Sequence, residues 1–217
     1  MQILIACEES QEVCKAFREL GFEAYSCDLK DCSGGHPEWH LKMDVFQAIN
    51  LHHWDLMIAH PPCTFLSISG NRWMNDEVHY PNRKRDRQEA IDFFLKLAQA
   101  DIEHIAIENP IGIMSTQWKK PSQIIQPYQF GDRAQKTTCL WLKNLPLLTP
   151  TNIVDSGEFH VTKSGKKQPQ WYYDALWSKT QEGRRTIRSK TFPGIAKAMA
   201  EQWGGYLIDE KENKRTN

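Results

Sequence analysis

The chain alternates short, continuous runs of apolar residues with longer segments in which apolar residues recur every three or four positions. A short run bounded by polar or turn-forming residues is typical of a strand that is buried on both faces of a sheet. The last run is also rich in β-branched and aromatic residues, which favour strands. These runs predict five strands, at Gln2–Cys7, Glu23–Leu29, Asp55–Ala59, Ile105–Ile107 and Lys136–Leu142.

The segments with helical spacing predict four helices, at Ser10–Leu20, Val45–Asn50, Arg85–Ala100 and Pro193–Tyr206. Gly21 follows the first of them, and glycine commonly ends helices because it tolerates a left-handed conformation. Asp44 precedes the second, and aspartate is a favoured N-terminal cap. Both signals agree with the boundaries that the apolar spacing gives.

Strands that alternate with helices of this length predict an α/β fold, a Rossmann-like, doubly wound sheet that is mostly parallel. A chain of 217 residues accommodates one domain with a sizeable insertion. The pattern breaks between positions 149 and 190, which are polar, aromatic and basic. We therefore expect a core over residues 1–148, a small insert over 149–190, a C-terminal helix and strand over 191–209 that complete the core, and a flexible tail over 210–217.

Charge and composition narrow the class of protein. The 27 lysines and arginines balance the 27 aspartates and glutamates, so the overall charge does not indicate a nucleic-acid partner. Residues 151–190 differ, because eight basic side chains there outnumber four acidic ones and give a local charge of +4. No apolar stretch reaches membrane-spanning length. The six cysteines show no paired spacing, which favours free thiols in the reducing cytoplasm.

A metal site is not expected. Cys27, Cys32, His36 and His40 lie within one region of the sequence, but their spacing is not that of a usual zinc site. Cys27 also falls within a predicted strand.

Two predicted strands end in residues that could carry chemistry. Asp55–Ala59 leads through two prolines to Cys63, and Ile105–Ile107 leads directly to Glu108. Ligands of doubly wound sheets bind at the carboxyl ends of strands, so a thiol and a carboxylic acid would meet there. This pairing favours covalent attack by a thiolate, with the acid managing protons. Partial burial would raise the pKa of Glu108 and keep it protonated near neutrality. The alternatives are a buried free cysteine and a capping or surface glutamate.

The turn after the first strand indicates which cofactor could bind. Its sequence, Cys7-Glu8-Glu9-Ser10-Gln11-Glu12, lacks the glycine-rich pattern of dinucleotide-binding turns, and two glutamates would repel a pyrophosphate. A cofactor with a positive centre and an amino group would suit this turn better. Alternatively, Glu8 and Glu9 only favour the N-terminus of the next helix. Asp28, at the end of the second strand, is placed to accept hydrogen bonds from ribose hydroxyls.

Taken together, Pro61-Pro62-Cys63 and Glu108-Asn109-Pro110 resemble the catalytic motifs of the DNA (cytosine-5)-methyltransferases, which carry Pro-Cys after the fourth strand and Glu-Asn-Val after the fifth. The resemblance covers roughly residues 2–142 and 189–203. It implies the S-adenosylmethionine-dependent methyltransferase fold in a compact, phage-like member with a reduced target-recognition region. It also implies methylation of cytosine C5 through a covalent intermediate on Cys63, with the target base flipped out of the DNA.

The resemblance further implies roles for individual residues. Lys136 best replaces the arginines of the family's Gln-Arg-x-Arg motif and would join Cys63 and Glu108 as a catalytic residue, with Arg133 as the second candidate. Pro62, Asn109 and Arg133 would contact the substrate. The cofactor S-adenosyl-L-methionine would be held by Glu8, Ser10, Asp28, Asp44, Pro61, Lys190 and Thr191.

The basic segment bears on the remaining hypotheses. Its aromatic residues could stack on bases, and Arg184, Arg185 and Arg188 could contact phosphates, which favours DNA as the partner. Two alternatives stay open: an enzyme of the same fold that acts on single-stranded DNA, RNA or a free nucleotide, and a non-catalytic nucleic-acid-binding relative. The segment could also simply cover the edge of the sheet. No obligate protein partner is indicated.

Overall fold

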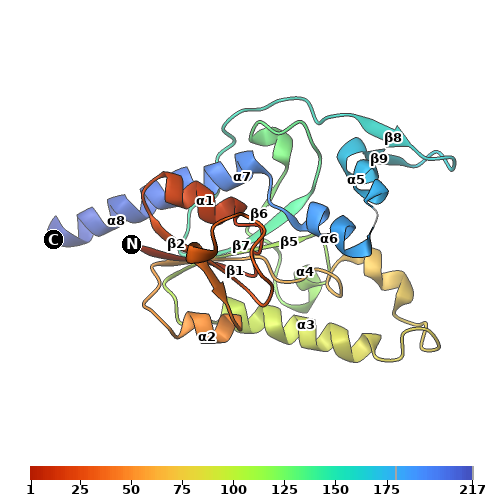
Figure 1. Cartoon of the computed structure of the whole chain (residues 1–217), viewed down its shortest axis with the longest axis horizontal. Helices are drawn as coiled ribbons and strands as arrows, with labels where there is room; N and C mark the ends of the chain where they lie inside the picture. The colour runs from red at the N-terminus through yellow and green to blue at the C-terminus, as the bar shows by residue number, and fades with distance from the viewer. Residues whose placement is uncertain (179, 217) are drawn as a thin grey trace.

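The computed structural model describes residues 1–178 and 180–216; for residues 72, 181, 182, 185 and 186 it describes the backbone alone. Its centre is a seven-stranded sheet in the order β3-β2-β1-β4-β5-β7-β6 (Figure 1). The strands from β3 to β5 run parallel to their neighbours, and β7 runs antiparallel between β5 and β6. The predicted fold, a Rossmann-like, doubly wound and mostly parallel α/β sheet, is confirmed.

The sheet comprises β1 (Gln2–Ala6), β2 (Glu23–Asp28), β3 (His40–Lys42), β4 (Leu56–Ala59), β5 (His104–Pro110), β6 (Gln123–Ile125) and β7 (Thr138–Lys143). The apolar pattern predicts all of these strands except β3 and β6. Each of the two is three residues long and lies at an edge of the sheet, where a strand pairs on one side and needs no continuous apolar run.

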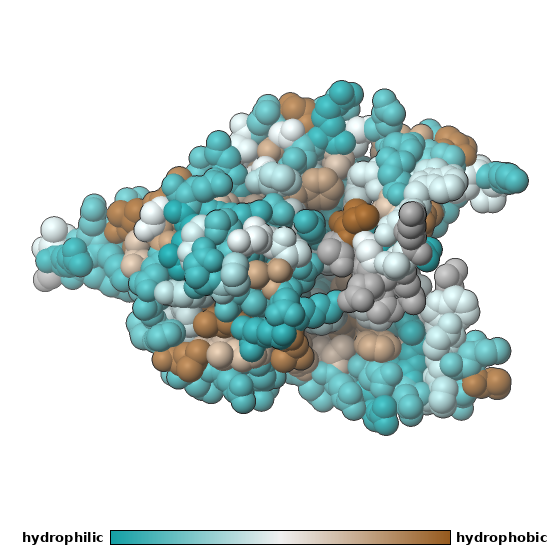
Figure 2. Space-filling view, in the orientation of Figure 1, coloured by the Kyte–Doolittle hydropathy of each residue, from teal (hydrophilic) through white to brown (hydrophobic). Residues whose placement is uncertain are grey.

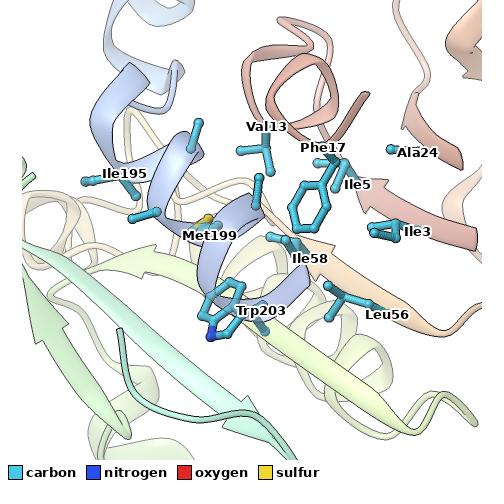
Figure 3. Packing of buried hydrophobic residues seen from close by; sticks show 14 of the residues in the cluster. Ile3, Ile5, Val13, Phe17, Ala24, Leu56, Ile58, Ile195, Met199 and Trp203 are labelled. Carbon is cyan, nitrogen blue, oxygen red and sulfur yellow. The ribbon is translucent and has the colours of Figure 1, made fainter. Parts of the chain in front are cut away.

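Helices cover both faces of the sheet (Figure 1). Along β1 the side chains alternate, so Ile3 packs with Phe17 and Trp203 on one face while Leu4 packs with Phe94 on the other. Figure 3 shows the first of these two cores. The first face is covered by α1 (Glu12–Glu19), α7 (Pro193–Ala198) and α8 (Gly204–Thr216), and the second by α2 (Val45–Ile49) and α3 (Arg83–Ala98).

The insert at 149–190 contains regular structure that its composition did not predict. Its elements are a separate hairpin of β8 (Phe159–Val161) and β9 (Lys167–Pro169), helix α5 (Gln170–Asp174), a helical turn at Ala175–Trp177 and helix α6 (Gln181–Ser189). Shorter helical segments elsewhere are Pro37–Trp39, Ile68–Trp73, α4 (Met114–Gln117), Pro127–Gln129 and Met199–Trp203. No helix within the described ranges is both long enough and apolar enough to cross a membrane.

The C-terminal segment differs from the prediction. Residues 191–209 contain helix and no strand, and residues 210–216, predicted to be a flexible tail, continue α8. Two ion pairs hold this end to the sheet: Nζ of Lys211 lies 2.8 Å from Oδ1 of Asp55, and Nζ of Lys214 lies 3.0 Å from Oε1 of Glu103. The charges that suggested a frayed tail in the sequence are thus partly used in contacts with the starts of β4 and β5.

The order of the strands determines where a ligand can bind. The chain proceeds from β1 outward to β2 and β3, and then returns to β4 on the other side of β1. Loops that leave the carboxyl ends of β1 and β4 therefore diverge and leave a crevice between them. Cys7 begins the loop after β1, and His60 begins the loop after β4. The residues predicted to carry chemistry surround this crevice.

Candidate active site

Cys63 lies in the loop that follows β4. The amide of His60 still continues the sheet, because it donates to the carbonyl of Ala6 at 2.9 Å. The two prolines that follow have no amide hydrogen and end the strand. The carbonyl of Cys63 then accepts hydrogen bonds from the amides of Leu66 and Ser67 at 3.1 and 2.9 Å. This tight turn leaves Cys63 exposed at the carboxyl end of the sheet.

Glu108 lies in β5, the neighbour of β4, and its side chain is only 14% exposed. Its Oε2 lies 3.2 Å from Nδ1 of His60. The next residue, Asn109, is buried, and its Nδ2 donates to the carbonyl of Pro61 at 2.7 Å. Asn109 was predicted to contact substrate. The structure places it behind the loop that carries Cys63, where it fixes the backbone of that loop.

The electrostatic surroundings of Glu108 differ from the prediction. Burial by itself raises the pKa of this carboxyl, but the hydrogen bond with His60 and the positive charges of Lys136 and His60 outweigh burial and bring the pKa below its ordinary value. The prediction of a carboxyl group that is protonated near neutrality is therefore wrong. The sequence indicated that the strand is buried, but it did not show which basic side chains face its end.

The Cys63 thiol has a pKa above its ordinary value. The largest cause is desolvation, because nearby protein atoms keep water away from the sulfur and disfavour its charged form. The negative charge of Glu108 raises the pKa further. The positive charges of Lys136 and Arg188 act in the opposite direction. Because a thiolate is the reactive form, these two basic residues support nucleophilic chemistry at Cys63.

Lys136 is the basic residue before β7 that faces the site. Its Nζ donates to the carbonyl of Lys190 at 3.1 Å, and its charge acts on both the thiol and the carboxyl group. Arg133, the second candidate, has an exposed side chain that pairs with Asp155 at 2.7 Å. Of these two candidates, the geometry therefore favours Lys136.

A cavity of about 260 Å³ opens at the ends of β1 and β2 and the start of α2, and it reaches Cys63 through the preceding residue, Pro62, which is part of its lining. Asp28 and Asp44, two of the residues predicted to hold the cofactor, both line it; their role in binding stays a prediction. Oδ1 of Asp28 accepts a hydrogen bond from the amide of Lys30 at 3.0 Å, and the described residues place no backbone amide on Oδ2. The remaining lining is largely apolar: Cys7, Cys27, Leu29, Met43, Val45, Pro62, Phe65, Ala90 and Phe93.

Glu8 points into the protein and not into this cavity. Its Oε1 accepts a hydrogen bond from the amide of Val13 at 2.7 Å, and its Oε2 accepts one from the amide of Cys14 at 3.2 Å. Glu8 therefore caps the start of α1, which is the alternative that the sequence left open. Ser10 is buried in the same turn.

The other predicted cofactor residues surround the site without lining the main cavity. Pro61 is buried, and Pro62, predicted to face substrate, lines the cavity in its place. Nζ of Lys190 lies 3.8 Å from Oε1 of Glu12, at the start of α1. Thr191 contributes to a second, much smaller cavity whose other lining residues are Glu108, Lys136, Thr138, Phe192 and Ile195.

The insert at 149–190 lies beside this site. Trp171 attaches it to the core, because its Nε1 donates to the carbonyl of Gln135 at 3.1 Å and its ring packs against Phe192 at 5.3 Å. On α6, the guanidinium of Arg188 lies 4.6 Å from the ring centre of Tyr172. Because its charge also acts on the Cys63 thiol, Arg188 lies close enough to take part in the site.

The insert also presents groups that the site does not use. Arg184 Nε donates to the carbonyl of Thr180 at 3.4 Å, and the Trp177 side chain is 74% exposed. The predicted contact Arg185 has a side chain outside the described part of the structure. Figure 2 shows the outline of the molecule indented between the β8–β9 hairpin and the loop before α3.

Sequence reasoning missed His60 and most of the cavity lining. The apolar lining residues lie just after strands or on helices, where the sequence pattern assigns them to the core. His60 had one signal, its position between an apolar strand and the two prolines. Its contact with Glu108 joins residues 48 positions apart and depends on the pairing of β4 with β5.

One group of possible metal ligands lies close together among the described residues. It consists of Glu103, His104 and Glu210, at the opposite end of β5. Lys214 pairs with both glutamates, at 3.0 and 3.5 Å, and Nε2 of His104 lies 3.1 Å from Oε2 of Glu210. The group is therefore accounted for as a network of ion pairs.

No model of a known protein family matches the sequence, and no curated protein matches it. Solved structures that align with the chain include a protein encoded within an E. coli prophage and described as a DNA modification methyltransferase, with 14% identity, a TM-score of 0.46 and 84% of this chain covered. Another is a mutant of Spodoptera frugiperda DNMT2, with 15% identity, a TM-score of 0.44 and 72% of this chain covered. A third is the S. pombe Dnmt2 methyltransferase, with 15% identity, a TM-score of 0.42 and 83% of this chain covered. The chain spans 66%, 57% and 61% of those proteins, respectively.

Proposed function

We propose that this chain is an S-adenosylmethionine-dependent DNA (cytosine-5)-methyltransferase that acts through a covalent bond to Cys63. The observation that carries the proposal is the position of Cys63 and Glu108 at the carboxyl ends of neighbouring strands, beside a largely apolar cavity that also contains two carboxylates. A nucleophile, a carboxylate and a cavity suited to a nucleoside in one crevice fit the methylation of a pyrimidine ring.

The residues that line the cavity fit the proposed cofactor. Apolar walls, including Phe65 and Phe93, suit a flat adenine ring, and Oδ2 of Asp28 suits ribose hydroxyls. Asp44 would accept from the adenine amino group. A pyrophosphate would meet these two carboxylates with no basic side chain among the described residues that line the cavity, which disfavours a dinucleotide. When bound, S-adenosylmethionine supplies an electrophilic methyl group on a positively charged sulfur.

The proposed chemistry assigns a separate task to each group. The Cys63 thiol loses its proton to solvent and the thiolate forms a bond to C6 of cytosine, while N3 takes up a proton from solvent that Glu108 stabilises, so that electron density rises at C5. After C5 is methylated, a base removes the C5 proton, the bond from Cys63 to C6 breaks and N3 releases its proton to solvent, which restores the ring and the thiolate. Lys136 lowers the pKa of the thiol and so favours the thiolate. Because Glu108 begins as a carboxylate, it stabilises the N3 proton and does not have to supply it.

DNA is the substrate that the insert favours. Its net charge of +4 and its exposed Trp177 suit phosphates and bases, and Arg188 lies near the thiol. A cytosine inside a duplex cannot reach Cys63 without leaving the stack, so base flipping is expected. The small insert leaves room for few base contacts, and recognition should involve only a few base pairs.

A mechanism-based trap tests this proposal. DNA that contains 5-fluorocytosine should form a covalent adduct with the wild-type protein in the presence of S-adenosylmethionine, because fluorine at C5 prevents the elimination step. Cys63→Ala should abolish the adduct, whereas the control Cys32→Ala, in a loop outside the cavity lining, should retain it. Glu108→Gln removes the negative charge that stabilises the N3 proton and should slow methyl transfer by about 10²-fold or more. An adduct that persists in Cys63→Ala would refute the assignment.

The same assay separates DNA from the alternative substrates. Duplex DNA, single-stranded DNA, RNA and free cytidine nucleotides are compared at equal cytosine concentration. We expect the adduct with DNA. An adduct that forms with RNA or a nucleotide and not with DNA would keep the chemistry and replace the substrate.

A further inference from the structure

His60 has no role in the mechanism proposed above, although its ring contacts Glu108 in the candidate active site. Its side chain is 9% exposed and projects from the end of β4. Nδ1 lies 3.2 Å from Oε2 of Glu108. Nε2 is buried and has no hydrogen-bond partner among the described residues. A buried ring nitrogen without a partner is uncommon in a folded protein and calls for an explanation.

Charged groups face His60 from different elements. Glu108 faces it from β5, and Glu8 interacts with it electrostatically from the turn after β1. Burial raises the pKa of Glu8, the charge of Glu12 also raises it, and His60 and two backbone amides act against these effects. Lys136 acts on Glu108 from the segment before β7. Buried charges are stable only in pairs, so the 3.2 Å contact with the His60 ring favours the charged form of Glu108.

We propose that His60 is a positioning residue: it holds Glu108 as an oriented carboxylate at the carboxyl end of the sheet. This inference rests on the proposed function. Because a carboxylate only accepts hydrogen bonds, Nδ1 carries the proton in this contact. His60 then occupies Oε2 and leaves Oε1 for the N3 edge of the pyrimidine. No bond at His60 is made or broken during the reaction.

Three substitutions separate the two ring nitrogens. Asparagine keeps an N–H group near the position of Nδ1, glutamine keeps one near Nε2, and leucine removes both. His104 provides a matched control, because it is also buried, its Nδ1 lies 3.0 Å from the carbonyl of Asp55, and it lies at the other end of β5. His104→Asn therefore changes a buried histidine without touching Glu108.

The first measurement needs neither substrate nor cofactor. The protein is labelled with ¹³C at the glutamate side-chain carboxyl, and its resonances are followed through a pH titration; the signal missing in Glu108→Gln identifies Glu108. His60→Leu and His60→Gln should move the Glu108 titration to higher pH, because the hydrogen bond and charge that lower its pKa are lost. His60→Asn should move it less, and His104→Asn should leave it in place.

The first measurement overturns the proposal if Glu108 titrates as in the wild type in both His60→Leu and His60→Gln. If His60→Leu does not fold, the comparison of asparagine with glutamine decides, and equal shifts in these two variants overturn the proposal as well.

The second measurement is the rate of cytosine methylation as a function of pH. In His60→Gln, kcat should fall about tenfold or more, with a smaller loss in His60→Asn, while KM for the cofactor stays within about twofold. The acid limb of the kcat profile should follow the Glu108 titration of each variant. A loss confined to KM, or equal losses in both variants, overturns the proposal. A wild-type protein that methylates no cytosine refutes the proposed function, and the titration then still decides whether His60 controls Glu108.

Discussion

Asp28 is the residue whose substitution tests the cofactor assignment most directly. It ends β2 and lines the main cavity. The Lys30 amide occupies only its Oδ1, at 3.0 Å. In the proposed complex, the second oxygen accepts a hydrogen bond from a ribose hydroxyl. Asp28→Ala removes this acceptor and places no new atoms in the cavity.

The expected magnitude follows from the charge of the acceptor. A hydrogen bond to a charged group contributes about 1.5–3 kcal/mol, which corresponds to an increase in Kd of about 10- to 150-fold when the bond is lost. Asp28→Asn keeps an acceptor oxygen without its charge, so the increase should stay below about tenfold. The loss of the turn contact with Lys30 affects stability as well, and thermal unfolding of each variant measures that effect separately.

Isothermal titration calorimetry with S-adenosylhomocysteine measures the change in affinity. Asp31→Ala is the control, because Asp31 lies three residues further along, its side chain is 86% exposed and it pairs with Lys42 outside the cavity. Its Kd should stay within about twofold of the wild-type value. If Asp28→Ala also binds within about twofold of wild type, Asp28 does not hold the ligand. Binding of NAD with no response to S-adenosylhomocysteine would refute the cofactor assignment as a whole.

Two further predictions concern the thiol and the DNA surface. The rate at which iodoacetamide alkylates Cys63 at pH 8, followed by site-resolved mass spectrometry, reports the fraction of thiolate. Alkylation should be faster in Glu108→Gln and slower in Lys136→Met, because the carboxylate raises the thiol pKa and the ammonium lowers it. The opposite order would contradict this electrostatic account. Arg188→Ala should weaken DNA binding and reduce by about one the slope of the logarithm of the binding constant against the logarithm of the salt concentration. The control Lys197→Ala, at an exposed position on α7, should change neither the affinity nor the slope. An unchanged slope in Arg188→Ala would exclude a phosphate contact at Arg188.

The central strands of the fold could be predicted from the sequence because burial on both faces requires a continuous apolar run. β1 and β4 satisfy this condition, and their predicted bounds differ from the observed ones by one residue at one end. The edge strands β3 and β6 could not be predicted, because their pairing depends on neighbours and not on their own composition. The same holds for the β8–β9 hairpin, whose two strands are three residues long each.

The candidate site could be predicted in part. The placement of Cys63 and Glu108 follows from the ends of two strands, and the sequence shows where those strands end. The low pKa of Glu108 does not follow, because it depends on His60 and Lys136, which the pairing of β4 with β5 and of β5 with β7 brings close. Burial can be inferred from one segment, whereas an electrostatic environment requires knowledge of which segments meet.

The turn after β1 has an unusual backbone conformation for a segment without glycine. Cys7 and Gln11 adopt positive φ angles of 59° and 60°, which non-glycine residues rarely do and which cost free energy. The surroundings hold this conformation: the amide of Glu8 donates to the carbonyl of Cys27 at 3.1 Å, and Nε2 of Gln11 donates to Ser26 Oγ at 3.1 Å. The turn is therefore shaped by its contacts and not by glycines.

The sequence associates the acidic turn with a cofactor, but the structure directs the side chain of Glu8 toward the start of α1. Glu8 points inward, where it caps α1 and interacts electrostatically with His60, while Cys7 of the same turn lines the main cavity. His60 also contacts Glu108, so the charge of the imidazole acts on both carboxyl groups. If this connection operates, Glu8→Gln should move the Glu108 titration although the two carboxylates do not touch, and a Glu108 titration unchanged by Glu8→Gln would confine the role of Glu8 to capping α1.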